Sequence, residues 1–257
     1  MLKAIIFDVD GTLAETEELH RIAFNTAFAD NSLSWHWDRK QYRELLKVSG
    51  GKERIRHFIE TGQLPQRERA DLADFIAALH RHKTAVYTQS VIDGKAELRP
   101  GVRQLINAAR SEGIRLAIAT TTSLPNVEAL LRAAFNEAGD GLFEVICAGD
   151  SVPAKKPAPD IYLDALRLLE LPADACLAIE DSRNGLLSAH QAGIATVITP
   201  GIYTDDQDFS EAHLVIPDLC SVATAELLAR FGNYGRPERR QELNEENDSQ
   251  RRNVGRI

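Results

Sequence analysis

Two aspartates follow directly on a short apolar run near the start of the chain. Ile5, Ile6 and Phe7 are typical of a buried β-strand, and Asp8 and Asp10 come immediately afterwards, two residues apart. A carboxylate in apolar surroundings is costly unless it is paired, hydrogen-bonded or bound to a metal ion. The spacing therefore indicates that these acids serve chemistry rather than packing.

Other segments carry reactive side chains at equivalent places. The apolar stretch 114–119 is followed by the hydroxyl cluster 120–123, CLAIE leads into Glu180 and Asp181, and Lys156 precedes a proline after FEVIC. In a parallel α/β sheet, ligands collect outside the carboxyl ends of the strands. A single aspartate at a strand end is more often a helix cap or a turn former. Several strand ends that supply acids, hydroxyls and a lysine together predict one shared site.

Electrostatics require a cation among these acids. Two carboxylates about 4 Å apart repel by about 4 kcal/mol at an effective dielectric constant of 20. Mg²⁺ prefers oxygen ligands and binds through one or two carboxylates together with substrate phosphate oxygens. The sequence has no cysteine and histidine cluster that would favour zinc. We therefore predict a Mg²⁺ site and phosphate chemistry, with Thr120 and Lys156 available to hold phosphoryl oxygens.

Alternating strands and helices would position these residues. A strand is expected at 4–7, and beyond residue 100 short apolar strands alternate with helices. The further strands are predicted at 114–119, 143–147, 176–179, 195–198 and 214–216. One helix is expected to end near 111–113, one to carry Pro125 in its first turn, and two to begin near Pro159 and Ser182. This alternation predicts an α/β fold, a Rossmann-like parallel sheet flanked by helices on both faces.

Between the first strand and residue 95, apolar residues recur at helical spacing. Leu19, Ile22, Ala23 and Ala27 are expected on one face of a first helix. Further helices are predicted around 45–46, 55–59 and 72–79. The predicted organisation is an α/β core domain at 1–15 and 96–232, an inserted all-helical cap domain at 16–95, and a tail at 233–257. The tail has few large apolar residues, so we expect it to be disordered or loosely attached.

Composition and charge argue against some classes of partner. Of 257 residues, 44% are hydrophobic and 26% are charged, which is ordinary for a soluble globular enzyme. The net charge of -8 disfavours nucleic acids and anionic membranes, which need a basic face. The sequence shows neither a long apolar run for a membrane span nor a charged and then apolar leader. We expect a monomeric cytoplasmic protein without nucleic-acid or membrane partners.

The cysteines are predicted to be small buried thiols. Cys147, Cys176 and Cys220 are odd in number and far apart in the chain. An unpaired cysteine most often packs as a small hydrophobic residue. This usage fits a reducing compartment.

Four short motifs of the chain resemble those of a known superfamily. Asp8-Val9-Asp10-Gly11-Thr12, then Thr120, then Lys156 before Pro157, and finally Glu180-Asp181 resemble, in order, the four motifs of the haloacid dehalogenase superfamily of phosphohydrolases. The resemblance runs from residue 1 to about residue 230. It implies the α/β core of that superfamily, and the helical insert resembles its small cap domain.

The resemblance also implies roles for these residues. Asp8 would be the nucleophile that forms an aspartyl-phosphate, and Asp10 would protonate the leaving oxygen and then activate water. Asp8, the backbone carbonyl of Asp10 and Asp181 would bind Mg²⁺, with Glu180 assisting directly or through water. Thr120 and Lys156 would neutralise charge on the transferring group. The alternative for Lys156 is a solvated surface lysine.

The substrate is implied by a narrower resemblance, to the CbbY group of phosphatases that hydrolyse xylulose 1,5-bisphosphate. It lies in the stretches DVDGTLAETEELH, WDRKQYRELLKVSGGKERI, HRHK, ATTTSLPNVEAL, AGDSVPAKKPAPDIY and PGIYT. The implied substrate contacts are Asp8, Glu17, His20, Tyr42, Gly50, Gly51, Lys52, Glu53, Arg54, His80, Arg81, His82, Lys83, Thr120, Thr121, Thr122, Ser123, Leu124, Pro125 and Asn126. A core role for Tyr42 is equally compatible with the sequence. Without the resemblance, Lys52, Arg54, His80 and Lys83 would be read as a solvated face.

Three alternatives remain beside this reading. The nearest is a β-phosphoglucomutase, which shares the fold and the nucleophile, and in which Thr16, His20 and Lys52 would have counterparts in the cap. The loop Thr122 to Asn126 differs from the pair of residues expected in that mutase, which favours the phosphatase. The second is a phosphatase with a broader range of sugar phosphates. The third is a non-catalytic scaffold, which the presence of Asp8, Asp10 and Asp181 disfavours.

Overall fold

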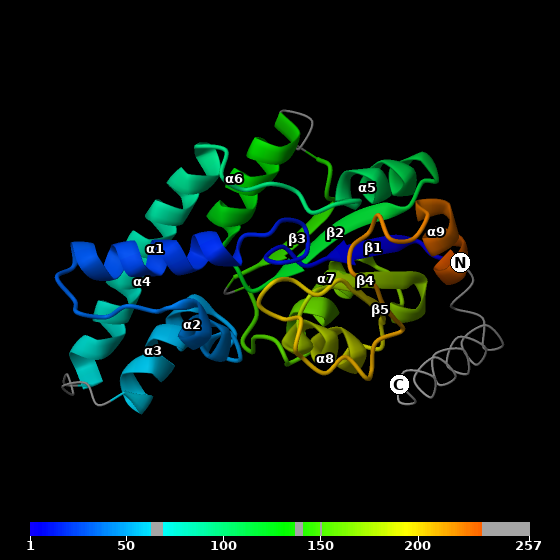
Figure 1. Cartoon of the computed structure of the whole chain (residues 1–257). Helices are drawn as coiled ribbons and strands as arrows, with labels where there is room; N and C mark the ends of the chain where they lie inside the picture. Colours follow the sequence, from blue (N-terminus) through cyan, green and yellow to red (C-terminus); the bar gives the residue numbers. More distant parts are fainter. Residues whose placement is uncertain (63–68, 137–140, 150, 233–257) are drawn as a thin grey trace, which may run out of the picture.

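A parallel β-sheet forms the centre of the molecule, as the computed structural model shows (Figure 1). The structure describes residues 1–62, 69–136, 141–149 and 151–232. Within these residues the sheet has six strands in the order β3-β2-β1-β4-β5-β6, and neighbouring strands run parallel. The strands are β1 (Ala4–Phe7), β2 (Arg115–Thr120), β3 (Val145–Ala148), β4 (Cys176–Glu180), β5 (Ala195–Ile198) and β6 (Leu214–Val215). The predicted strands and the predicted parallel α/β fold are confirmed.

Helices cover both faces of the sheet because its strands are apolar on both sides. In β1, Ile5 and Phe7 pack into one core cluster, while Ala4 and Ile6 pack into the other. The first cluster includes side chains of α5 (Val102–Ser111), α6 (Leu124–Phe135) and α9 (Thr224–Gly232). The second includes side chains of α7 (Asp160–Leu169) and α8 (Arg183–Gln191), and the short helix η2 (Ala173–Ala175) leads into β4.

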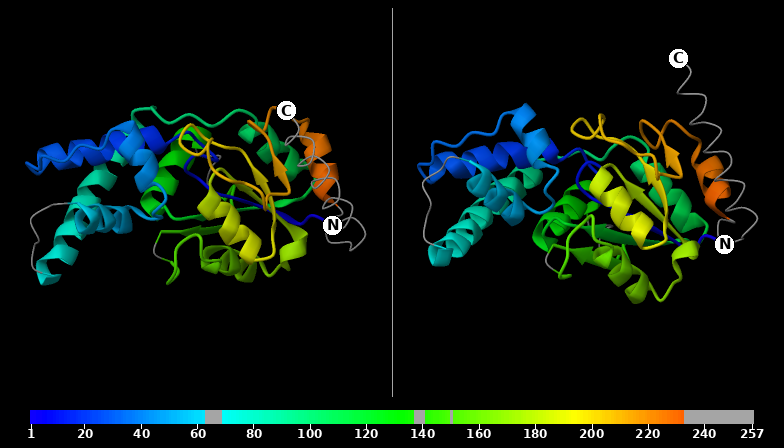
Figure 2. Two further views of the ribbon diagram at one scale, coloured as in Figure 1. Left: turned by 60° about the horizontal axis from the view of Figure 1, so that its bottom comes forward. Right: turned by 90° about the horizontal axis from the view of Figure 1, so that it is seen from below.

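The chain between β1 and α5 forms a helical unit beside the sheet, at the left of Figure 1 and of both views in Figure 2. It contains α1 (Glu17–Asp30), α2 (Arg39–Leu45), α3 (Gly51–Thr61) and α4 (Arg69–Ile92). Its core centres on Trp37, whose ring contacts Phe24, Phe28, Tyr42 and Phe58. We refer to α1 through α4 and their connections as the cap. The domain boundaries at residues 16 and 95 remain predictions.

Two expectations about burial are wrong in part. Ile22 is 45% exposed, because the buried face of α1 includes His20 and Phe24 and residue 22 points away from that face. Cys220 is exposed in the turn that follows β6, whereas Cys147 and Cys176 are buried in strands as predicted.

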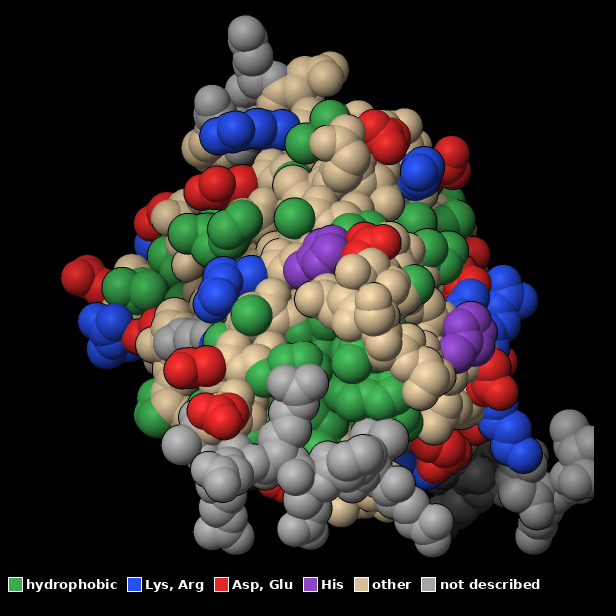
Figure 3. Space-filling view, turned by 90° about the vertical axis from the view of Figure 1, so that its left-hand side faces the viewer, with side chains coloured by type: hydrophobic (Ala, Val, Ile, Leu, Met, Phe, Trp, Pro, Cys, Tyr) green, Lys and Arg blue, Asp and Glu red, His purple; other side chains and the backbone are tan. Residues whose placement is uncertain are grey.

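The outer face of the cap carries mixed charges. Seen from the cap side, Lys and Arg side chains stand apart from one another, with acidic side chains in between (Figure 3). None of the described helices is long and apolar enough to cross a membrane. The predicted disordered tail at 233–257 lies outside the described residues.

Candidate active site

A cavity of about 600 Å³ lies between the carboxyl edge of the sheet and the cap. Many of the residues predicted to act or to bind substrate line it together. From the core these are Asp8, Asp10, Thr120, Thr121, Thr122, Ser123, Leu124, Asn126, Lys156 and Asp181, and from the cap Glu17, His20, Gly50, Gly51, Lys52, Arg54, His80 and Lys83. Residues from the ends of different strands therefore line one cavity, as expected for a parallel sheet.

Strand pairing sets the acidic end of this cavity. Phe7 of β1 is paired with Ile179 of β4, so the next residues, Asp8 and Glu180, emerge side by side. One ligand oxygen each of Asp8, Glu180 and Asp181 lies within 4.8 Å of the others. All three residues are buried. Their proximity follows from the register of the sheet rather than from loop conformation.

Lys156 lies among these carboxylates. Its Nζ donates to Asp8 Oδ1 at 2.7 Å, to Glu180 Oε1 at 2.5 Å and to the Ala119 carbonyl at 2.8 Å. Tyr162 OH also donates to Glu180 Oε1, at 2.7 Å. Burial opposes a charged lysine, but the negative charges of Asp8 and Glu180 outweigh it and raise the pKa of Lys156. The interpretation of Lys156 as a solvated surface residue is therefore wrong.

The three acids of this cluster outnumber Lys156, and their ionisation is opposed. Burial raises the pKa of Asp8 to about 8; Lys156 opposes this shift and Glu180 adds to it. Burial, Asp8 and Glu180 raise the pKa of Asp181 well above its usual value. A cation bound among these carboxylates would favour their ionised forms and so lower the raised pKa values.

The donor set fits Mg²⁺. It consists of carboxylate oxygens, the ligand type that this ion prefers. Glu180 Oε2 is buried without a hydrogen-bond partner among the described residues. Gly11 has a φ of +80° and leaves space beside Asp181, because a Cβ atom at this position would overlap the Asp181 carboxylate. The acidic cluster could therefore hold a metal ion through Asp8, Asp181 and Glu180.

Asp10 has a different environment, which the cap supplies. Thr16 Oγ1 donates to Asp10 Oδ1 at 2.5 Å, and His20 Nε2 lies 2.9 Å from the same oxygen. Thr16 precedes α1 and His20 follows one turn later, so both reach the same carboxylate. Burial alone would raise the pKa of Asp10, but His20, Thr16 and Lys83 outweigh it and hold that pKa below its usual range. The pKa of Asp8 is thus raised and the pKa of Asp10 is lowered.

Buried cations of the cap complete the far side of the cavity. Lys83 Nζ contacts His20 Nδ1, and burial lowers the pKa of Lys83 to about 7. Burial and the nearby charges of Lys83 and Lys52 lower the pKa of His80 to about 3. His80 is therefore neutral near pH 7, and the positive charge that attracts anions to this end comes from Lys52 and Arg54 of α3 and in part from Lys83 of α4.

A chain of hydrogen bonds supports the cap wall. Tyr42 OH donates to Glu17 Oε2 at 2.8 Å and accepts from Arg54 Nη1 at 3.2 Å. Arg54 Nε also donates to the Leu45 carbonyl at 3.1 Å. Tyr42 is fully buried in the cap core and does not line the cavity, so of its two readings the structure favours the core role.

The loop after β2 supplies hydroxyl and amide groups. Thr120 is buried, and its Oγ1 accepts from the Thr122 amide at 3.3 Å. Asn126 Nδ2 donates to Thr122 Oγ1 at 3.0 Å, which shapes the loop. Ser123 Oγ is buried and has no hydrogen-bond partner among the described residues.

Some predicted contact residues do not line the cavity. Arg81 is exposed, and His82 pairs with Asp30 at 3.1 Å and Asn31 at 3.0 Å outside it. The reason is helical geometry, since His80 and Lys83 share one face of α4 and the two residues between them do not. Glu53, Pro125 and Glu180 also lie outside the lining.

Sequence reasoning missed several residues of this site. Tyr162 and Thr204 lie in the quoted stretches AGDSVPAKKPAPDIY and PGIYT, so a signal for both was present. Arg43, in the quoted stretch WDRKQYRELLKVSGGKERI, also had such a signal, and it lines the cavity together with Asn184. Asn184 Nδ2 donates to the Lys47 carbonyl at 3.0 Å. Asn184 and Lys47 are separated by 137 residues, so no local pattern could have predicted their contact.

Comparison with known proteins assigns the class. The family model for haloacid dehalogenase-like hydrolases matches residues 2–193. The chain belongs to this family, and the predicted enzyme class, a haloacid dehalogenase-type phosphatase, is confirmed.

Within the family, the chain is similar to CbbY proteins. It is 53% identical over 224 residues to Protein CbbY of Rhodobacter capsulatus, covering 87% of this chain and 96% of the relative. A crystal structure of a CbbY mutant from Rhodobacter sphaeroides in complex with xylulose 1,5-bisphosphate is 48% identical, with a TM-score of 0.81 over 87% of this chain and 97% of that one. A β-phosphoglucomutase from Clostridium difficile is 20% identical with a TM-score of 0.71 over 91% and 99%, a likeness of fold alone.

The opposite environments of the two aspartates predict opposite effects on stability. The pKa of Asp8 rises from 3.8 to about 8 on folding. Between these values the native state binds more protons than the unfolded state, so the free energy of unfolding falls as pH rises. In metal-free protein, Asp8→Asn should remove this fall and raise Tm at pH 8 by at least about 3 °C, or ~1 kcal/mol, with a smaller gain at pH 5.

Asp10→Asn is the matched control. The folded pKa of Asp10 lies below the unfolded value, so its contribution to stability is present above the unfolded pKa and is lost as pH falls. This variant should therefore lower Tm at pH 8. Thermal unfolding in EDTA measures both variants, and a loss of Tm at pH 8 for Asp8→Asn would contradict the assigned electrostatics.

Proposed function

We propose that this enzyme is a Mg²⁺-dependent sugar-phosphate phosphatase that removes the C1 phosphate of xylulose 1,5-bisphosphate, giving xylulose 5-phosphate and phosphate. The proposal is carried by one observation: a cavity with the acidic cluster and Lys156 at one end and buried cations at the other. It is supported by the similarity to a CbbY protein whose mutant was crystallised with that bisphosphate.

Asp8 is the nucleophile in this proposal. Lys156 binds Asp8 Oδ1, which leaves Oδ2 to attack phosphorus. A bond forms between Asp8 and phosphorus while the bond from phosphorus to the sugar oxygen breaks. Lys156 and Thr120 then stabilise the charge on the transferring group, as fixed donors in a buried site do.

Asp10 moves the protons. A phosphate dianion bound nearby opposes ionisation of Asp10, so the substrate itself favours the protonated acid that the leaving sugar oxygen needs. Once the sugar leaves, Asp10 takes a proton from the water that attacks the aspartyl-phosphate, and phosphate is released with Asp8 regenerated. Thr16 and His20 hold the Asp10 carboxylate through Oδ1 during both steps.

The metal belongs at the acidic cluster. Asp8, Asp181 and the backbone carbonyl of Asp10 would hold Mg²⁺, with Glu180 assisting directly or through water. When bound, the ion neutralises charge on phosphoryl oxygens. Glu180 also holds Lys156 and Tyr162 through Oε1, so it fixes the position of the lysine.

The cap end of the cavity would bind the second phosphate. Lys52, Arg54, His80 and Lys83 face it, and α3 begins at the pair Gly50 and Gly51. A helix start presents backbone N–H groups to an anion. Gly50 adopts a φ of +92°, and a Cβ atom on Gly51 would overlap the His80 ring, so both positions require glycine. The predicted contacts of Glu17 and Thr121 to Asn126 would place the sugar between the two phosphates.

The biological setting follows from the same substrate. The resemblance to the CbbY group implies a substrate that is an inhibitory by-product of rubisco, so we further propose a role in carbon fixation, in the Calvin cycle. We also propose a cytoplasmic monomer without nucleic-acid or membrane partners. The net charge of -8 supports the absence of such partners.

A mutase is the second candidate function, because the solved mutase shares this fold. A mutase must keep water from its aspartyl-phosphate while the bound sugar phosphate turns around. The much higher identity to CbbY proteins favours hydrolysis.

The direct test incubates the purified protein with Mg²⁺ and a panel of phosphorylated sugars, and measures released phosphate and isomer formation. We expect phosphate release to be greatest with xylulose 1,5-bisphosphate and to be abolished in Asp8→Asn. Conversion of β-glucose 1-phosphate to glucose 6-phosphate without net release would establish the mutase instead. Similar rates over many sugar phosphates would establish the broader phosphatase.

The role of the cap cations is tested with Lys52→Ala. Loss of one charge-assisted contact should lower kcat/KM for the bisphosphate by roughly tenfold to a hundredfold. Turnover of p-nitrophenyl phosphate, which has no second phosphate, should stay within about twofold. Arg56→Ala is the matched control, since Arg56 is an exposed cation on the same helix. Equal losses on both substrates would remove Lys52 from second-phosphate binding.

A further inference from the structure

The turn 201–206, which follows β5, contacts both the acidic cluster and the cap. It begins in the stretch PGIYT and lies between β5 and β6 in the chain. No role in the proposed reaction has yet been given to it. Two adjacent side chains, Tyr203 and Thr204, point to different partners, and both are buried.

Thr204 contacts the acidic cluster. Its Oγ1 accepts from the Gly201 amide at 2.8 Å. The same hydroxyl can donate its hydrogen to Asp181 Oδ2, which lies 3.3 Å away. The Gly201 carbonyl, at 3.4 Å, is the other acceptor within reach.

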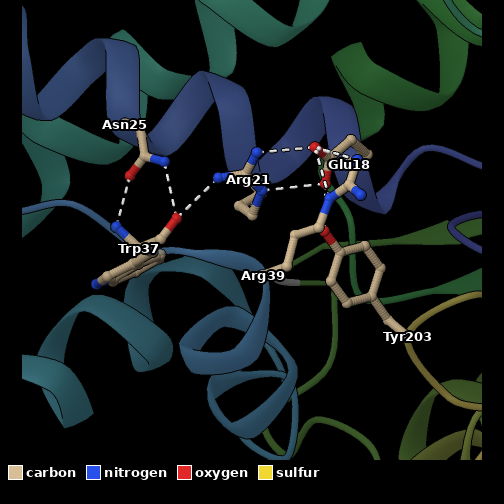
Figure 4. Close-up of polar contacts among 6 residues, drawn as sticks. All are labelled: Glu18, Arg21, Asn25, Trp37, Arg39 and Tyr203. Carbon is tan, nitrogen blue, oxygen red and sulfur yellow. Dashed lines mark hydrogen bonds and ion pairs between the residues drawn. The ribbon is translucent and has the colours of Figure 1, made fainter.

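Tyr203 contacts the cap. Its OH donates to Glu18 of α1, and its ring packs edge-on against Tyr42 with centroids 5.5 Å apart. Figure 4 shows that Glu18 is shared, because Arg21 and Arg39 reach the same carboxylate. Tyr42 in turn holds Glu17, which lines the cavity. Tyr203 is therefore connected through Tyr42 to Glu17, a predicted substrate contact.

An ion-pair cluster adds to the connection between the turn and the cap. Arg43 of α2 lies 2.6 Å from Asp205 Oδ1 and 2.9 Å from Asp206 Oδ1. It also donates to the Ile202 carbonyl at 2.5 Å. These groups are partly exposed, so the pairs contribute less than the buried contacts of Tyr203 and Thr204.

Arg99 fixes the start of the turn. Its Nη2 donates to the Pro200 carbonyl at 2.8 Å, and its Nη1 donates to the Gly11 carbonyl in the loop that carries Asp8 and Asp10. Its backbone amide donates to the Leu13 carbonyl at 2.9 Å. With its start held by the core, the turn is a fixed support between the cap and Asp181.

We propose that the 201–206 turn is a positioning element for the reaction, in which Thr204 orients the Asp181 carboxylate for the metal and Tyr203 seats the cap on the core. The inference rests on the proposed function, because it takes Asp181 as a metal ligand and the cap as the substrate wall. Outer hydrogen bonds that orient ligating carboxylates are a general feature of metal sites. The adjacency of the two residues means that displacing one alters the support of the other.

The test of Thr204 is Mg²⁺ binding, measured by isothermal titration calorimetry on substrate-free protein. Thr204→Val keeps the volume and removes the hydroxyl, and it should weaken the Kd for Mg²⁺ by roughly tenfold. Thr204→Ser restores the hydroxyl and should bind within about twofold of the unsubstituted protein. Thermal unfolding without metal is measured in parallel, so that a variant that fails to fold is recognised and Thr204→Ala replaces it.

The test of Tyr203 is a comparison of two substrates. Tyr203→Phe keeps the ring against Tyr42 and loses the donor to Glu18, and it should raise KM for xylulose 1,5-bisphosphate about fivefold. Its kcat/KM for p-nitrophenyl phosphate should stay within about twofold. Arg39→Ala is the matched control, because it removes a partner of the same Glu18 that lies within the cap and whose side chain is 73% exposed. This control should leave KM for the bisphosphate and kcat/KM for p-nitrophenyl phosphate unchanged.

The outcomes separate this inference from the function on which it rests. If the unsubstituted protein neither binds Mg²⁺ nor releases phosphate, the proposed function is wrong. If it does both, and Thr204→Val binds Mg²⁺ as tightly, the assignment of Thr204 is overturned. If Tyr203→Phe affects both substrates equally, or Arg39→Ala matches it, the assignment of Tyr203 is overturned.

Discussion

The buried ion-pair cluster around Lys156 is the constraint on which the site depends. Asp8 and Glu180 are placed side by side by the pairing of β1 with β4, and Lys156 binds both at 2.7 and 2.5 Å. Removing Lys156 from such a cluster would typically cost about 3–5 kcal/mol, because the carboxylates would remain buried without their counter-charge. The same arrangement leaves Asp8 Oδ2 and Asp181 for a metal and a phosphoryl group. Lys156 therefore both stabilises the buried carboxylates and holds Asp8 in place for the proposed reaction.

The cap divides the work of the two aspartates. Asp8 lies within the core and has a raised pKa, whereas Asp10, two residues later, contacts Thr16 and His20 from the cap and has a lowered pKa. Pairs of acids whose environments separate their proton affinities are typical of acid–base sites. Because the cap also carries the cations that would bind a second phosphate, substrate choice and proton transfer would both depend on the same contact with the core. The 201–206 turn also contacts the cap, through Tyr203 and Glu18.

The sequence predicted what depends on local pattern and on the strand-end rule. All six described strands were placed from apolar runs, and Asp8, Thr120, Lys156 and Asp181 were brought together because parallel strands end at one edge. Arg81 and His82 were included through the resemblance of the HRHK stretch, but the helix turns their side chains away from the cavity. The contacts of Tyr203 with Glu18 and of Asn184 with Lys47 join residues more than a hundred positions apart. Such tertiary contacts have no periodic signal, so only coordinates could reveal them.

The central claim is that Asp8 carries the phosphoryl group during turnover. Rapid acid quenching of the enzyme with Mg²⁺ and xylulose 1,5-bisphosphate, followed by borohydride reduction and peptide mass spectrometry, tests it directly. The account predicts that Asp8 alone is converted to homoserine, the reduction product of an aspartyl-phosphate, and that Asp8→Asn shows none. Rapid phosphate release without any modified residue, or modification at another acid, would contradict the account.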